Sequence, residues 1–154
     1  MTYNPASAPA DAAILASAIP HGYDYSRIVA TMVVAGLQPN RSYAAQAHTN
    51  PCGPTAQDAG PPYQDRIDSA ARPDAPSAAP RYANPHNDIR LDIHTDAAGE
   101  GTSQTTVPFG FTDRRPGSIV LNEATATAPG HAGEAGAPIA CVTLQPADDS
   151  SGRR

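Results

Sequence analysis

The chain contains no tryptophan, only two phenylalanines and few large aliphatic residues. Leu, Ile, Val and Phe together make up less than a fifth of the chain, a level at which intrinsic disorder has to be considered. Disorder also requires a high net charge, however, and the formal charge here is only −5. Composition therefore leaves the choice between a folded and a disordered chain open, and the hydrophobic pattern has to decide it.

Lysine is absent, and all ten basic residues are arginines scattered along a mildly acidic chain. No basic stripe is available to bind phosphates, so we expect no nucleic-acid partner. No apolar run approaches the roughly 20 residues that a transmembrane helix needs, so we expect no membrane span. A Gly-x-Ser-x-Gly elbow, a phosphate-binding loop and a dinucleotide-binding fingerprint are also missing, which argues against the enzyme classes that use them.

A helical hydrophobic period is missing too, and 17 prolines with 12 glycines disfavour long helices. Period-two alternation recurs instead, most clearly in residues 88–96 (DIRLDIHTD), where Ile89, Leu91 and Ile93 share one face. We predict strands at residues 12–19, 27–37, 42–49, 88–96, 105–111, 118–123 and 139–144. Short strands separated by Gly/Pro turns predict an all-β fold, a Greek-key β-sandwich or barrel of about seven to eight antiparallel strands.

Two stretches between the expected strands, residues 49–87 and 124–138, are too long and irregular for hairpin turns. Long loops inside a compact domain are typically functional or mobile. The polar C-terminal residues 146–154 are predicted to form a disordered tail. We therefore expect one folded domain that spans residues 1–145.

Two segments carry the most specific signal, and each contains one of the only two cysteines. Residues 46–63 read QAHTNPCGPTAQDAGPPY, and residues 133–144 read GEAGAPIACVTL. Together they resemble the copper/zinc superoxide dismutase family, most closely its secreted, actinobacterial-type domains. The resemblance covers nearly all of residues 2–145, with specific motifs in 40–63 and 118–144. It implies a Greek-key β-sandwich, in agreement with the strand pattern, and a metal site for copper and zinc.

The resemblance also indicates that the copper site is degenerate. Of the four positions where the family has copper-binding histidines, only His48 retains one, and the others hold Gln46, Pro62 and Asn122. Gln46 and His48 keep the i, i+2 spacing that places two side chains on one face of a strand. Amide oxygens are poor copper donors beside imidazole, and proline has no donor side chain. At Pro138 the family has an arginine that attracts the superoxide anion, so that guiding charge is missing.

The zinc ligands of the family are incomplete as well. The family takes two further histidines and an aspartate from the long loop, whereas this loop has only His86. The carboxylates near it are Asp65, Asp68, Asp74 and Asp88. A closed zinc site normally has four ligands with His or Cys prominent, and none can be assembled here. His48 and His86 remain the candidate metal ligands, and two imidazoles support only weak metal binding.

Ordinary interpretations compete with metal binding at each histidine. A lone imidazole at His48 is also typical of a hydrogen-bonded structural histidine, and His86 is typical of an exposed loop residue. His94 lies on the polar side of residues 88–96 and is expected to be solvated. His21 and His131 lie in glycine-flanked turns and are assigned no role.

The two cysteines are interpreted as one long-range disulfide, Cys52–Cys141, and the resemblance implies that it ties the long loop to the strand carrying the second cysteine. Closing a loop of that length stabilises a fold by about 4–5 kcal/mol on the chain-entropy model. A structural disulfide indicates an extracytoplasmic or secreted protein. Residues 1–3 nevertheless lead straight into polar, Pro-rich sequence without a signal peptide. Two unpaired thiols in a cytosolic protein are the alternative interpretation.

We therefore expect a catalytically inactive dismutase-like domain, with no catalytic residue, no bound cofactor and a structural or interaction role. A superoxide dismutase with a residual or rearranged copper site is the alternative. A third interpretation is a metal-storage or delivery module that uses His48, His86 and loop carboxylates. The sequence identifies no protein partner and does not distinguish a monomer from a homodimer.

Overall fold

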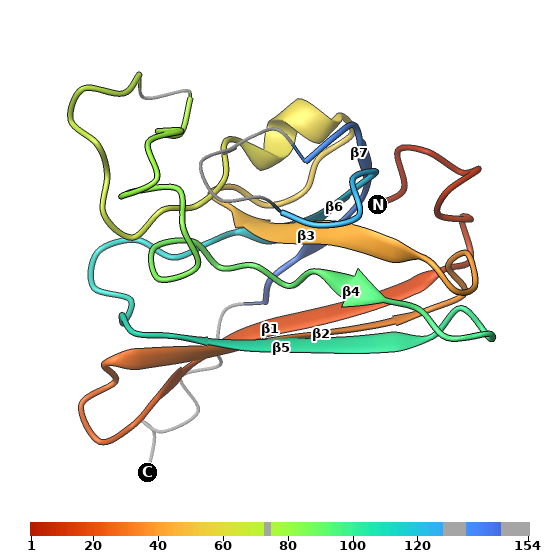
Figure 1. Cartoon of the computed structure of the whole chain (residues 1–154), viewed down its shortest axis with the longest axis horizontal. Helices are drawn as coiled ribbons and strands as arrows, with labels where there is room; N and C mark the ends of the chain where they lie inside the picture. Colours follow the sequence, from red (N-terminus) through yellow and green to blue (C-terminus); the bar gives the residue numbers. More distant parts are fainter. Residues whose placement is uncertain (73–74, 128–134, 146–154) are drawn as a thin grey trace, which may run out of the picture.

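Two antiparallel β-sheets lie face to face with the core between them (Figure 1). The structure, a computed structural model, describes residues 1–72, 75–127 and 135–145. The elements are β1 (Ala13–His21), β2 (Arg27–Ala35), β3 (Ser42–His48), the short 3-10 helix η1 (Ala56–Ala59), β4 (Ile93–His94), β5 (Gly101–Val107), β6 (Ser118–Asn122) and β7 (Pro138–Thr143). One sheet has the order β1-β2-β5 and the other β4-β3-β6-β7. Because β5 returns to pair with β2 and β6 returns to pair with β3, the chain is the Greek-key β-sandwich that the sequence predicts.

Strict alternation along β2 shows why these segments form strands. Ile28, Ala30, Met32 and Val34 are at most 1% exposed, and the residues between them face away from the core. A register slip of one residue would turn all four side chains toward solvent, so burial fixes the pairing with β1 and β5. Many inward positions on the facing strands are alanines, which keeps the core thin.

The predicted strand at residues 88–96 is shorter than expected. Only Ile93–His94 is regular strand, as β4. The hydrophobic side of the segment is nevertheless buried as predicted, with Ile89 and Leu91 fully enclosed. The regular ladder is interrupted at Asp92, whose carboxylate accepts the amide hydrogen of Ala45, and pairing with β3 resumes only as an isolated bridge between Arg90 and Gln46.

The predicted strand at residues 105–111 is displaced, because β5 starts at Gly101 and ends at Val107. Pro108 follows directly and cannot donate to β2, which ends the ladder. Beyond it, Gly110 packs against the turn between β1 and β2. A Cβ atom there would lie 2.2 Å from the carbonyl oxygen of Tyr25, so only glycine fits.

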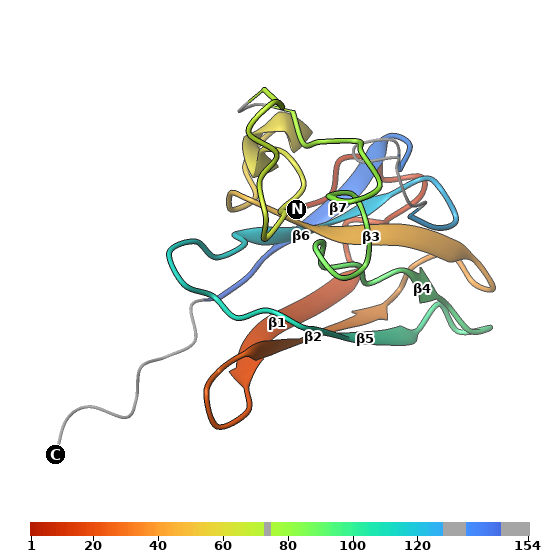
Figure 2. The same ribbon diagram turned by 60° about the vertical axis from the view of Figure 1, so that its left-hand side comes forward.

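Residues 49–72 and 75–87 form an irregular layer over the outer side of β3 and β6, and two views agree on this placement (Figures 1 and 2). The part of the chain described here contains no helix long or apolar enough to cross a membrane. Asp74, His131 and the predicted tail at 146–154 lie outside the described residues. The domain limits at residues 1–145 stay a prediction.

A disulfide joins the long loop to β7, as predicted. Cys52 and Cys141 are bonded with their Cα atoms 5.9 Å apart. Cys141 is buried and packs with Ala59 of η1 and Val120 of β6 on the outer side of the sheet. The bond therefore closes a separation of 89 residues and holds the start of the loop against the sheet.

Removing this bond should lower stability strongly, because the core is thin and the loop has few other apolar contacts. For the Cys52→Ser/Cys141→Ser double variant we expect a loss of about 4–5 kcal/mol, from the loop-closure entropy of the unfolded chain. Chemical denaturation with and without reductant measures this, and reductant should have no effect on the variant. Equal unfolding midpoints for oxidised and reduced wild-type protein would contradict the assignment.

Candidate functional site

The outer side of β3 and β6, beneath the loop layer, carries three of the positions singled out in the sequence, Gln46, His48 and Asn122. Ala45 and Ala47 of β3 face the core, so Gln46 and His48 face outward. The same alternation turns Asn122 of β6 outward, because its neighbours in the core lie on the other side. Gln46 pairs with Val120, which makes Gln46 and Asn122 diagonal neighbours at about 7–8 Å on one surface.

Two prolines complete this group of positions. Pro62 forms a β-bridge with His48, so the loop crosses directly beside the histidine. Pro138 is the first residue of β7 and pairs with Asn122, next to a register irregularity between β6 and β7. The five positions singled out in the sequence therefore follow one another across this surface, each next to one or two of the others. Their side chains supply one imidazole, two amides and two pyrrolidine rings.

His48 is held by a hydrogen bond to the loop. Its Nδ1 lies 2.7 Å from the carbonyl oxygen of Gly60. A carbonyl only accepts, so Nδ1 carries the proton and Nε2 carries a free lone pair. Nε2 is buried and has no hydrogen-bond partner among the residues that the structure describes. Burial lowers the pKa of His48 below its ordinary value, and the hydrogen bond to Gly60 offsets only part of this effect. The imidazole is therefore neutral near pH 7.

The backbone conformation at Gly60 places its carbonyl oxygen next to His48. Gly60 has a φ of 69°, a region that favours glycine. A Cβ atom there would lie 2.4 Å from the Thr49 hydroxyl and 2.8 Å from the Asn50 amide. Asn50 in turn donates its side-chain amide to the Asp58 carbonyl, which links the turn to η1 (3.2 Å). The loop conformation around His48 thus depends on a residue without a side chain.

A buried ion pair lies beside Gln46, and sequence reasoning did not identify it. Asp88 Oδ2 accepts a hydrogen bond from Arg90 Nη2 at 2.9 Å, with both side chains at most 10% exposed. Arg90 is the cross-strand neighbour of Gln46. Desolvation raises the pKa of Asp88, and the Arg90 guanidinium counteracts this only in part. The signal available in the sequence was the i, i+2 spacing of opposite charges on one strand face.

The second long loop is anchored to the same surface through Asp92. Its Oδ2 accepts from the backbone amide of Thr127 at 2.7 Å, and its Oδ1 accepts from the Thr127 hydroxyl at 2.7 Å. Oδ1 also accepts from the amide of Ala45 on β3 at 3.0 Å. Arg90 adds a weaker bond from Nη1 to the Thr127 carbonyl at 3.4 Å. Sequence analysis treated Asp92 as an ordinary polar-face residue, because its role depends on a loop distant in sequence.

The remaining candidates stand apart from this surface or make contacts of their own. His86 is exposed, and Asn84 accepts its backbone amide hydrogen. His94 is exposed as predicted and lies 2.9 Å from the Ser42 hydroxyl through Nδ1. Asp68 accepts from the Ser77 hydroxyl at 2.8 Å. Within residues 1–72, 75–127 and 135–145, no three His, Cys, Asp or Glu side chains form a group able to hold a metal ion.

The residues at this surface do not fit the copper centre of the resembled family. Copper that cycles between two oxidation states is well served by several imidazoles. Here His48 offers one buried Nε2, and the amides of Gln46 and Asn122 are weak donors. Pro62 offers no donor at all.

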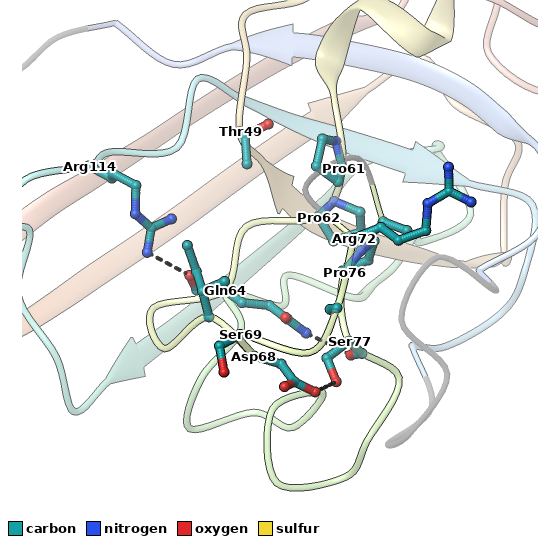
Figure 3. Close-up of a pocket in the computed structure, with 13 residues that line it drawn as sticks. Thr49, Pro61, Pro62, Gln64, Asp68, Ser69, Arg72, Pro76, Ser77 and Arg114 are labelled. Carbon is teal, nitrogen blue, oxygen red and sulfur yellow. Dashed lines mark hydrogen bonds between the residues drawn. The ribbon is translucent and has the colours of Figure 1, made fainter.

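A cavity of about 340 Å³ is lined in part by Thr49, Pro61 and Pro62, next to the bridge between Pro62 and His48 (Figure 3). Its walls are mainly apolar and include Ile67 and Pro76. Arg114 borders it, but this guanidinium donates to the backbone carbonyls of Gln64 and Asp65 at 3.1 and 2.8 Å. Arg114 therefore holds the loop in place, and the end of its guanidinium is hydrogen-bonded to backbone carbonyls of the loop.

Neither a family model nor a curated protein sequence matches this chain.

The lowered pKa of His48 predicts a pH-dependent stability. The unfolded chain binds a proton near the ordinary value of 6.5, whereas the folded chain resists it, so stability falls as pH drops below about 6.5. His48→Asn keeps a donor for the Gly60 carbonyl and removes the titration. We expect the variant to have a shallower decline of melting temperature between pH 7.5 and 5, roughly the window in which histidines titrate. His94→Asn, at an exposed position, is the control and should retain the wild-type slope; equal slopes for all three proteins would contradict this account.

The buried ion pair predicts an asymmetric mutational effect. Arg90→Met leaves the Asp88 carboxylate buried without its partner, so we expect a loss of about 3–5 kcal/mol. Adding Asp88→Asn removes the stranded charge and should recover most of that loss. Urea unfolding of the single and double variants measures the difference. Arg81→Met, at an exposed position, should change stability by less than about 1 kcal/mol. A double variant as unstable as Arg90→Met would show that the charge is not the cause.

Proposed function

We propose that this chain is a superoxide dismutase-like domain of the copper/zinc family that has lost copper-dependent catalysis and has a structural or interaction role. One observation carries the proposal. On the outer side of β3 and β6, Pro62 is bridged to His48, His48 follows Gln46 on the same face of β3, and Asn122 is diagonal to Gln46, with one imidazole among the four. These are the positions at which the resemblance places the four copper ligands.

The chemistry of dismutation explains why this set is inadequate. The metal must accept and return an electron, which requires ligands that hold both oxidation states of copper. One imidazole with two amides provides neither the affinity nor the tuning of four imidazoles. The cation that would attract superoxide is also replaced, because Pro138 stands beside Asn122.

An extracytoplasmic location follows from the same proposal. The Cys52–Cys141 bond closes the long loop onto β7, and structural disulfides of this kind persist mainly in oxidising compartments. Its role in holding the loop does not depend on a metal. On this proposal the disulfide, and not a metal ion, holds the long loop in place outside the cytoplasm.

A second candidate function, a residual copper site, is favoured by one specific feature of His48. The bond from Nδ1 to Gly60 fixes the tautomer, and it leaves Nε2 buried, unprotonated and without a partner. Metal-bound histidines are commonly oriented in this way through their other ring nitrogen. One such ligand supports weak binding, so this candidate differs from the first in affinity and activity.

Metal loading with a restored variant distinguishes the two candidates. Purified wild-type protein, incubated with copper and zinc and then desalted, should retain less than about a tenth of an equivalent of copper, because its donors are too few. The triple variant Gln46→His/Pro62→His/Asn122→His restores four imidazoles on the same surface and should retain markedly more. Elemental analysis measures the metal, and a superoxide assay compared with free copper measures activity.

His48→Ala in the restored background is the matched control and should lose the regained copper. Near one equivalent of tightly held copper in the wild-type protein, with activity above free copper, would overturn the first candidate and establish the second. Restored imidazoles that bind no copper would show that these positions do not form the ligand surface that the proposal assigns to them.

A further inference from the structure

The outer side of the β1-β2-β5 sheet carries large apolar side chains that are exposed. Leu15 is 72% exposed, Ile19 53% and Val33 44%. Leu15 and Val33 are directly opposite in the register of β1 and β2, and Ile19 is opposite Val29. The four side chains therefore form two apolar pairs on one face of the two strands, with Ser17 and Thr31 between them, and we call this set the outer stripe.

The surface around the outer stripe is almost free of charge. β1, β2 and β5 contain one charged residue, Arg27, which lies at the end of β2, whereas charged residues make up 16% of the chain. The remaining outward positions are occupied by polar, uncharged side chains. In one of these, the amide of Gln104 donates to the Thr31 hydroxyl at 3.1 Å, which satisfies the polar groups within the sheet.

The other sheet has strands that are similarly free of charge, but its outer side is covered. β3, β6 and β7 also lack charged residues, and the loop layer and the disulfide cover their outer side. Among the described residues, no comparable layer lies over β1, β2 and β5 (Figures 1 and 2). The exposure of Leu15 and Ile19 thus marks a side of the sandwich that is composed for contact.

We propose that a second copy of this chain covers this side, with the two outer stripes packed against each other about a twofold axis. An uncharged surface meets its own copy without like-charge repulsion, although each chain carries a net charge of −5. A nucleic acid or an anionic lipid surface would need clustered cations, and the sheet offers only Arg27. A strongly charged protein partner would find no complementary charge there.

The size of the surface sets the strength of the contact. Nine-residue strands span about 30 Å and three strands about 14 Å, which gives a footprint of roughly 400 Å². Stable complexes bury about 800 Å² per partner, so the sheet alone supports a weak dimer. The turn between β1 and β2 enlarges it, because it extends past the sheet on the side away from β3 (Figures 1 and 2).

That turn presents two tyrosines from a well-defined backbone. Tyr23 is fully exposed and Tyr25 is 68% exposed. Asp24 accepts the amide hydrogen of Ser26 at 3.2 Å, and the Tyr25 carbonyl packs against Gly110. Tyrosines held in this way add contact area at small entropic expense. The proposed interface therefore combines the outer stripe with this turn, and it does not depend on the loss of the metal ligands.

Analytical ultracentrifugation of the full chain tests the inference over a concentration series from about 10 µM to about 1 mM, the range in which a weak dimer forms. We expect a reversible monomer–dimer equilibrium for the wild-type protein. Leu15→Arg and Val33→Arg place a charge in each facing stripe and should weaken association by at least about tenfold, because like charges then oppose each other. Tyr23→Ala should weaken it by a smaller factor.

Ile67→Arg is the matched control, because Ile67 is 63% exposed but lies in the loop layer of the other sheet. It should associate like the wild-type protein. Thermal melts of all four variants establish that they fold, and exposed positions make large losses unexpected. A wild-type chain that stays monomeric across the series, or a Leu15→Arg variant that associates normally, would overturn the proposal.

Discussion

The attachment of the long loop to the outer side of β3, β6 and β7 is the constraint on which the candidate site depends. The inner core is thin, since alanines fill many of its positions, and the loop contributes few apolar side chains of its own. The Cys52–Cys141 bond closes the loop at one point, and the small cluster with Ala59 and Val120 gives it an apolar base. Only with the loop in this place does the Gly60 carbonyl reach His48.

Polar anchors extend this attachment along the rest of the surface. Asp92 holds Thr127 of the second loop, and Arg90 links Asp88 to the same residue. Asn87 binds the loop backbone at three points, accepting from the Arg66 amide and donating to two carbonyls. In a metal-containing relative of the proposed kind, ions would tie such loops to the sheet. Here side-chain hydrogen bonds and one buried ion pair attach the described parts of both loops to the sheet.

The sequence predicted the parts of this structure that local periodicity determines. Alternation at Ile28 to Val34 and at Ile89 and Leu91 identified buried faces correctly, because a two-residue period leaves no other way to bury them. It overestimated the strand at 88–96, because nothing local indicates that the Asp92 carboxylate takes the Ala45 amide hydrogen and leaves only an isolated bridge between Arg90 and Gln46. The motif at Cys52 and Cys141 predicted a long-range bond that periodicity cannot reveal. The anchors at Asp92 and Arg90 escaped notice, since their partners are more than 30 residues away along the chain.

The free lone pair of His48 is the point at which a purely structural account of the surface is incomplete. An unsatisfied buried polar atom costs about 1–3 kcal/mol. The bond to Gly60 uses Nδ1 alone, so the second ring nitrogen takes no part in holding the loop. The attachment of the loop therefore explains the role of Nδ1, which binds the Gly60 carbonyl, but it gives Nε2 no role in the fold. A water molecule or a small ligand at Nε2 would remove that cost, whereas the surrounding amides and prolines provide no copper centre. Nε2 is thus a lone-pair donor that the attachment of the loop leaves unused on this surface.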